Sequence, residues 1–530
     1  MSRVRIARPK LMSAVLAGAL LLGACSVVSD EGGEVSVEPI ESSTTIESSS
    51  PTSNSSTGTT MDPPSDGVGT ALIDQQLSWD DCGPDLECTE IIVPLDYDDL
   101  SGPTISLNVE RVPAARPKDR IGVLLVNPGG PGVAGTLLTE AASQIYSDDL
   151  LRRFDIVAWD PRGTGASSPV DCFTNLDDYF TMDPTPDDEA EKQAGLALSK
   201  QWAEQCHENA GDDLLAHVST QDTARDIDEI RKLLGEEQIS WFGFSYGSEL
   251  GATYATMFPD RVRAAVLDAS IDPTLTYYDG LLEQATQQER LLSKILGDCS
   301  ADTKCAFHNG GKAEAAFDEL MADLDATPIV AKGASGRPKV GQGIAVVATI
   351  QVMYVPSSWS ALTDALAEAQ AGDGRGLLDL YDSYLERSPS GSFTDAIEGL
   401  FAIGCLDDGD PGAVADADAI RPTLLKASPR LGDAFLYLNP CLYWPVKPVP
   451  RPDITGKGAG TILVVGSTGD PITPLASTKG MAEALEGGTL LVRDGEGHTS
   501  YASGNSCIDK AIDSYLIKLT APADGTICKD

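Results

Sequence analysis

Residues 243–247 read G-F-S-Y-G and fit the G-x-S-x-G pattern, in which a serine occupies a sharp turn between a strand and a helix. An apolar run precedes the motif at residues 239–242, and residues 248–258 have helical character. Glycines on both sides allow neighbouring backbones to approach such a turn closely. Ser245 is therefore the candidate nucleophile of an acyl-transfer reaction.

A serine nucleophile needs a general base, and the chain contains four histidines, which are His207, His217, His308 and His498. When a serine lies in this kind of turn, the catalytic residues follow the chain order serine, acid, histidine, which excludes His207 and His217. His308 falls within a long helical insertion, whereas His498 follows the last apolar run, where a loop can bring an imidazole to the serine. We predict that His498 is the base.

The third member is an acid that fixes the imidazole tautomer and stabilises the imidazolium. Asp470 lies in a tight turn after the penultimate apolar run and is the predicted acid. Asp494 and Glu496 are too close to His498 in sequence to reach its far nitrogen. Asp268, at the end of the strand after the motif, is the alternative acid, although we expect it to cap the next turn.

A glycine-rich segment, N-P-G-G-P-G at residues 127–132, follows the first strong apolar run. A tetrahedral intermediate needs two preorganised N–H donors, and a loop at this place commonly supplies one of them. We predict that the backbone N–H groups of Gly130 and Tyr246 form the oxyanion hole.

The elements that must position these residues alternate between strand and helix, which predicts an α/β fold with a doubly wound, mostly parallel sheet. We expect a first core segment at 70–271, a largely helical lid at 272–453 and a second core segment at 454–530 that carries Asp470 and His498. Expected strands are 122–127, 155–159, 239–244, 264–269, 462–466 and 489–492. Expected helices include 222–234, capped by Asp222 or Thr223, together with 281–296, 313–324 and 360–371.

The N-terminus has the features of an export signal, because four basic residues precede an apolar run that is too short to span a membrane. The sequence L-G-A-C at residues 22–25 resembles a bacterial lipobox, so we expect residues 1–24 to be removed and Cys25 to carry lipid. Residues 25–69 would then be a flexible tether on the outer face of the cell membrane, with the folded body starting near Trp79. The alternative is an ordinary secretory signal followed by a chance cysteine.

The formal net charge of -42 opposes binding to nucleic acid or to anionic lipid headgroups. Ten cysteines follow Cys25, an even number that favours disulfides in an oxidising compartment, and no metal site or cofactor is expected. Sequence proximity suggests the pairs Cys82–Cys88, Cys172–Cys206, Cys299–Cys305, Cys405–Cys441 and Cys507–Cys528.

Together with D-P-R-G-T-G-A-S at residues 160–167, these motifs resemble the proline iminopeptidase-like α/β hydrolases, and most closely the tripeptidyl aminopeptidases secreted by actinobacteria. The resemblance covers about residues 79–528. It implies an α/β-hydrolase fold and the release of short peptides, of tripeptide length, from a free N-terminus without a cofactor. One departure is Asn127-Pro128, where proline iminopeptidases commonly have histidine.

The resemblance also implies two substrate-binding residues. The segment A-I-G-C-L-D-D at 402–408 resembles an acidic motif of that branch, in which Asp407 would pair with the substrate ammonium, although a solvated acidic loop is the alternative. Thr473 falls in family order within the module that carries the predicted acid and base. The partner would be a peptide or protein with a free N-terminus.

Two other functions compete with a peptidase. An esterase or lipase could use the same catalytic residues, with an open apolar acyl pocket. A lipoprotein that binds peptides after losing catalysis is the second alternative, and the complete set of serine, acid, base and oxyanion loop argues against it.

Overall fold

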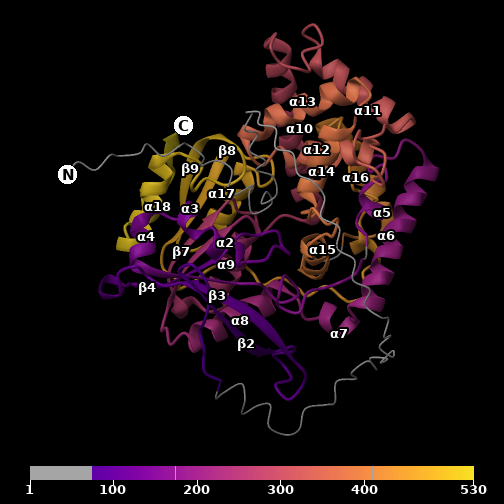
Figure 1. The fold of residues 1–530 in the computed structure, drawn as a ribbon. Coiled ribbons are helices and arrows are strands. Elements are labelled where there is room, and N and C mark those ends of the chain that lie inside the picture. Colours follow the sequence, from indigo (N-terminus) through magenta and orange to yellow (C-terminus); the bar gives the residue numbers. More distant parts are fainter. Residues whose placement is uncertain (1–74, 174, 408–410) are drawn as a thin grey trace, which may run out of the picture.

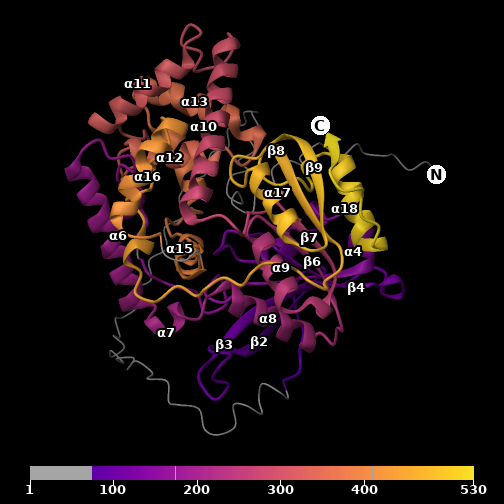
Figure 2. The same cartoon turned by 180° about the vertical axis from the view of Figure 1, so that it is seen from behind.

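The computed structural model describes residues 75–173, 175–407 and 411–530. The predicted signal peptide, the tether and Cys25 lie outside these ranges. Within them, every helix is too short or too polar to cross a bilayer. One ten-stranded sheet forms the centre (Figures 1 and 2). Its strands are β1 (Asp80–Gly83), β2 (Leu86–Pro94), β3 (Thr104–Val112), β4 (Gly122–Asn127), β5 (Phe154–Trp159), β6 (Ile239–Phe244), β7 (Val262–Asp268), β8 (Ile462–Gly469), β9 (Gly488–Glu496) and β10 (Thr526–Lys529).

The strand order is β1-β2-β3-β5-β4-β6-β7-β8-β9-β10. The pairs from β5 to β10 are parallel, and the pairs that join β1, β2, β3 and β5 are antiparallel. All six predicted strands are confirmed, and β1, β2, β3 and β10 are additional. The carboxyl ends of β6, β8 and β9 therefore meet at one edge of the sheet, where each is followed by a predicted catalytic residue.

Helices cover both faces of the sheet and build a second layer at one end (Figure 1). The helix predicted at 222–234 begins earlier, because Ser219 is its N-cap and accepts the N–H of Asp222; the prediction of Asp222 or Thr223 as the cap was wrong. The helices are α2 (Leu137–Glu140), α3 (Ala142–Ile145), α4 (Asp148–Arg153), α5 (Asp177–Phe180), α6 (Glu189–Asn209), α7 (Asp212–Leu215), α8 (Thr220–Leu233), α9 (Tyr246–Met257), α10 (Tyr277–Ala301), α11 (Ala313–Ala326), α12 (Gln342–Gln351), α13 (Trp359–Gln370), α14 (Arg375–Tyr384), α15 (Ala396–Asp407), α16 (Val414–Ala427), α17 (Leu475–Ala484) and α18 (Ser506–Lys518).

Alternate residues of the central strands enter two different hydrophobic cores. In β4, Val123 and Leu125 pack with α8 and α9, whereas Leu124 and Val126 pack with α4 and α18 on the opposite face. Because both faces are buried, the strand reads as a continuous apolar run rather than an alternating one. This arrangement is the doubly wound α/β fold that the sequence predicts.

The predicted helical insertion forms helices α10 to α16 above the carboxyl edge of the sheet (Figure 1), a layer that we call the cap. Helices α5 and α6 also belong to it, as the Ser199 hydroxyl donates a hydrogen bond to the carbonyl of Tyr437. Buried residues of the cap, such as Leu291 and Val346, join the same core as α8 and α9. The five predicted disulfides are all present, and three of them lie in the cap or between it and the loop after β5.

A buried arginine fastens the loop after β5 to the rest of the core. Arg162 and Asp226 are both fully buried and form a bidentate pair with N–O distances of 2.8 and 2.6 Å. The remaining guanidinium N–H groups donate to the carbonyls of Pro94, Leu95 and His217. All five donors of the guanidinium are thus used, and one side chain joins β2, the loop after β5 and α8.

We expect Asp226→Asn to lower the free energy of unfolding by about 3–5 kcal/mol, because it leaves a buried guanidinium without its counter-charge. Urea denaturation followed by circular dichroism measures this loss. The matched control is Asp379→Asn, which removes a surface pair with Arg375 and should cost less than about 1 kcal/mol. Equal effects of the two substitutions would contradict the role given to the buried pair.

Candidate active site

Ser245 occupies the turn between β6 and α9 in a backbone conformation that is rare for a residue with a side chain, with φ 52° and ψ -126°. Its N–H donates to the carbonyl of Asp268 at 2.8 Å, and its own carbonyl accepts the N–H of Ser248 at 2.8 Å. A Cβ at Gly243 would lie 1.9 Å from the carbonyl oxygen of Gly247, so the flanking glycines are sterically required. The strand, turn and helix predicted around the motif are present.

His498 and Asp470 are joined directly. The imidazole Nδ1 lies 3.0 and 2.9 Å from the two carboxylate oxygens of Asp470. The carboxylate is buried and also accepts the N–H groups of Ile472 and Thr473 at 2.9 and 3.0 Å. These bonds orient the carboxylate, which in turn holds Nδ1 as the protonated nitrogen and leaves Nε2 as the base.

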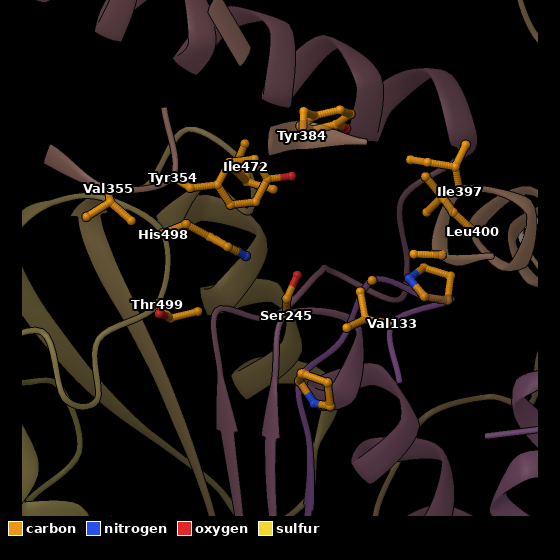
Figure 3. Close-up of a pocket in the computed structure, with 14 residues that line it drawn as sticks. Val133, Ser245, Tyr354, Val355, Tyr384, Ile397, Leu400, Ile472, His498 and Thr499 are labelled. Atoms are coloured by element: carbon orange, nitrogen blue, oxygen red, sulfur yellow. The ribbon is translucent and has the colours of Figure 1, made fainter. Parts of the chain in front are cut away.

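The free nitrogen of the imidazole faces the serine. Figure 3 shows the ring of His498 directed toward the Ser245 hydroxyl across the floor of the pocket. Nε2 is buried and has no hydrogen-bond partner among the described residues. A loose serine–histidine contact is common before substrate binds and tightens in the reacting complex. The backbone N–H of His498 donates to the carbonyl of Tyr354 at 2.9 Å, so the cap helps to place the base.

The two predicted oxyanion donors lie on adjoining segments. Tyr246 is the first residue of α9, and Gly130 lines the cavity that contains Ser245. A Cβ at Gly129 would lie 3.0 Å from the N atom of Tyr246, which shows how closely the glycine loop approaches the elbow. Within the described part of the chain, no hydrogen bond engages the N–H of Gly130 or of Tyr246. Both remain available to a developing oxyanion.

The catalytic cavity is small and mostly apolar, with a volume of about 160 Å³. Ser245 and His498 lie at its base, and the cap supplies much of its wall (Figure 3). Its described lining contains no carboxylate. No sequence motif identifies the cap residues of this wall, because their positions depend on how distant helices pack. The wall residues from the cap are Tyr354, Val355, Tyr384, Ala396, Ile397 and Leu400.

The two predicted substrate-binding residues do not line the cavity that contains Ser245. Asp407 and Thr473 line a neighbouring cavity of about 580 Å³, which shares Ile472 with the first. The Thr473 hydroxyl donates to Asp470 at 3.1 Å, so it supports the catalytic acid. The carboxylate of Asp407 accepts hydrogen bonds from Thr220, and burial raises the pKa of this carboxyl to about 7.

Asp268, the alternative acid, is not placed as predicted. Its carboxylate neither contacts His498 nor caps the next turn; it accepts the N–H groups of Ser500 and Tyr501 at 2.8 to 3.0 Å. Burial raises its pKa to about 6, and the backbone N–H groups act in the opposite direction. Asp268 therefore anchors the loop that follows the catalytic histidine. The sequence placed it at the right strand end but could not show which loop it would bind.

These features define a serine hydrolase of the α/β-hydrolase fold. Residues 122–315 match the family described as alpha/beta hydrolase fold, and residues 428–528 match the family described as TAP-like protein. The first match covers the nucleophile, and the second covers the acid and the base.

Similar proteins share most of their length with this chain. Serine protease Hip1 of Mycobacterium tuberculosis is 34% identical over 460 residues, which is 83% of this chain and 87% of the relative. Tripeptidyl aminopeptidase of Streptomyces coelicolor is 30% identical, with 85% and 86% covered. Carboxylesterase B of Mycobacterium tuberculosis is 32% identical, with 87% and 91% covered. The chain belongs to this actinobacterial family of α/β-hydrolase serine peptidases.

The triad assignment predicts how three substitutions affect hydrolysis of p-nitrophenyl acetate. Ser245→Ala should lower kcat by about 10⁶-fold, because the nucleophile is lost. Asp470→Asn should lower it by about 10⁴-fold, because the imidazole then takes the wrong tautomer. Asp494→Asn is the matched control, since its carboxylate accepts from the Thr468 hydroxyl and not from His498. Steady-state kinetics on the purified variants measure all three, and activity that survives Ser245→Ala would refute the assignment.

Proposed function

We propose that this serine peptidase releases short peptides, three residues long, from the free N-termini of peptides or proteins. The observation that carries the proposal is the complete Ser245, Asp470 and His498 triad beneath a cap that narrows access to it. Relatives named serine protease and tripeptidyl aminopeptidase support the same reaction.

The geometry gives each residue a step in that reaction. Ser245 Oγ attacks the scissile carbonyl while His498 Nε2 accepts its proton, and the N–H groups of Gly130 and Tyr246 stabilise the resulting oxyanion. The imidazolium then protonates the leaving amine, which departs and leaves an acyl-enzyme on Ser245. A water molecule, deprotonated by His498, attacks the ester, and the imidazolium returns the proton to Ser245 Oγ as the peptide leaves. Asp470 stabilises the imidazolium in both halves.

The cavities support a short extended substrate. The cavity at Ser245, about 160 Å³, is smaller than the roughly 300–1,000 Å³ typical of sites for drug-sized ligands, so it suits a single side chain. The adjoining cavity beyond Ile472, about 580 Å³, offers room for further residues and has the carboxylates of Asp272 and Asp407 on its wall. A peptide that bridges the two cavities would bind as a chain of a few residues.

One observation favours a second function. The Ser245 cavity is apolar and its described wall has no carboxylate, as an esterase would require, and one relative is named carboxylesterase B. The same triad hydrolyses esters, so ester turnover alone does not separate the two functions. The two functions are separated by whether a free amino group on the substrate raises the rate of cleavage.

We also propose that the protein is exported and held on the outer face of the bacterial cell membrane by lipid on Cys25. The support is the basic, short apolar leader followed by L-G-A-C at residues 22–25. The segment up to residue 69, rich in serine and threonine, would let the body stand away from the membrane.

We expect the purified full-length protein to cleave a tripeptide p-nitroanilide with a free amino group at least about tenfold faster than its N-acetylated twin, because only the former carries the charge that an acidic subsite binds. Release of p-nitroaniline measures both rates, and Ser245→Ala is the control for contaminating activity.

The other outcomes decide against the proposal in different ways. Equal cleavage of the two peptides would indicate endopeptidase or general hydrolase activity. Turnover of p-nitrophenyl acetate with no cleavage of either peptide would favour the esterase.

For the anchor, we expect cells fed a labelled fatty acid to transfer label to the wild-type protein and not to Cys25→Ala. The wild type should pellet with membranes, and the variant should not, because the variant lacks the acyl chains that would anchor the protein. A labelled Cys25→Ala variant, or an unlabelled wild type, would refute the proposal.

A further inference from the structure

The side chain of Tyr246, the residue after the nucleophile, points away from the catalytic cavity and into the protein. It is 5% exposed, and its hydroxyl forms a hydrogen bond with the hydroxyl of Thr220. Tyr246 is also the residue whose backbone N–H is a predicted oxyanion donor. A bond to the tyrosine hydroxyl therefore acts on the residue that carries an oxyanion donor.

Thr220 connects that hydroxyl to the cap. It is the first residue of α8, and its N–H donates to both oxygens of Asp407 at 2.9 and 3.0 Å. Its hydroxyl also bonds to Asp407. Asp407 thus lies at the N-terminus of a helix, where a negative charge is favoured by the helix dipole.

The hydrogen bonds that link Tyr246, Thr220 and Asp407 form a chain in which every hydroxyl donates toward Asp407. Above a pH of about 7 the Asp407 carboxylate is ionised and only accepts hydrogen bonds, so the Thr220 hydroxyl donates to it. The oxygen of Thr220 is then free to accept from Tyr246, and the tyrosine O–H has a single defined partner. Asp407 consequently fixes the orientation of both hydroxyls.

Asp407 is itself held firmly. It is the last residue of α15, two residues after the disulfide between Cys405 and Cys441. The carbonyl of Leu406 accepts the N–H of Val449 at 2.8 Å. Among the residues that the structure describes, the charged groups that act on Asp407 are Glu249 and Arg451, which lie 3.5 Å apart.

We propose that Asp407 is a positioning residue that acts through Thr220 and Tyr246 to hold the backbone donor next to Ser245, rather than a residue that binds the substrate ammonium. The inference rests on the proposed function only in its use of an acyl-enzyme on Ser245. The cap would then contribute to catalysis through the elbow as well as through the cavity wall.

Asp407→Asn tests this chain because it keeps the shape and replaces one acceptor oxygen by a donor NH₂. The N–H and the hydroxyl of Thr220 must then share the remaining oxygen, or the hydroxyl must turn toward Tyr246. Either change weakens the defined acceptor of the buried tyrosine O–H, and the elbow would shift. Tyr246→Phe removes the other end of the chain and leaves Asp407 in place.

The control is Glu398→Gln. Glu398 lies on the same cap helix and accepts the N–H groups of Cys172 and Phe173 at 3.1 and 2.7 Å, and burial raises its pKa to about 7, as for Asp407. It therefore reports the effect of weakening cap contacts without touching the elbow.

The experiment measures kcat and KM for p-nitrophenyl acetate, which has no amino group, and for the free-amine tripeptide p-nitroanilide. We expect Asp407→Asn and Tyr246→Phe each to lower kcat on both substrates by about tenfold, less than the roughly 10²–10³-fold loss from deleting an oxyanion donor. KM should stay within twofold, and Glu398→Gln should keep kcat within about twofold. The double variant should lose no more than the larger single loss, because both substitutions break one chain.

Three results would overturn the inference. A higher KM for the free-amine peptide with unchanged ester turnover would make Asp407 an amine-binding residue. An equal loss of kcat in Glu398→Gln would mean that the effect comes from weaker attachment of the cap. Losses of kcat that multiply in the double variant would mean that Asp407 and Tyr246 act independently and not through one chain of hydrogen bonds. A wild type that cleaves the ester but no peptide would refute the peptidase proposal alone, since the ester measurements would still test the chain.

Discussion

The strained turn at Ser245 is the constraint on which the rest of the active site depends. A non-glycine residue with φ near +50° and ψ near -126° costs on the order of 1–3 kcal/mol, and it persists only when its surroundings fix it. Here β7 binds the serine N–H, and β4 contributes the Asn127 carbonyl, 2.7 Å from where a Cβ of Gly247 would lie. Because the two neighbouring strands meet the turn at van der Waals distance, the hydroxyl can project only toward the carboxyl edge of the sheet.

The cap is fixed to this edge by carboxylates rather than by apolar contact alone. Around α15, Asp395 accepts the N–H of Gly165 at 2.7 Å, Glu398 accepts from the loop after β5, and Asp407 accepts from α8. Burial raises the pKa of each of these carboxyl groups, while the N–H donors favour the charged form. The same helix lines the catalytic cavity and shares the core of the body, so its position rests on many contacts rather than on any one of these bonds.

The sequence predicted those features that depend on local pattern. The elbow, Asp470 and His498 follow from short motifs in a known chain order, and the six predicted strands are continuous apolar runs that are buried on both faces. Strands β1 to β3 were not predicted, because their outer faces are partly exposed and polar residues interrupt their apolar ones. The hydrogen-bond partners of Asp268 and Asp407 were not predicted for another reason. Each partner lies more than 180 residues away along the chain. A carboxylate at the end of a strand or helix does not reveal which distant N–H it will accept.

The position of charge around the two cavities bears on the length of peptide that a free-amine enzyme of this shape would release. A peptidase that removes single residues needs its acidic group on the wall of the cavity that holds the first residue, because the ammonium lies one residue from the scissile bond. The described wall of the Ser245 cavity has no such group, whereas Asp272 lines the cavity beyond Ile472. An ammonium that reaches Asp272 must belong to a residue further from the scissile bond. Among exopeptidase modes, this separation favours release of a short peptide over release of single amino acids.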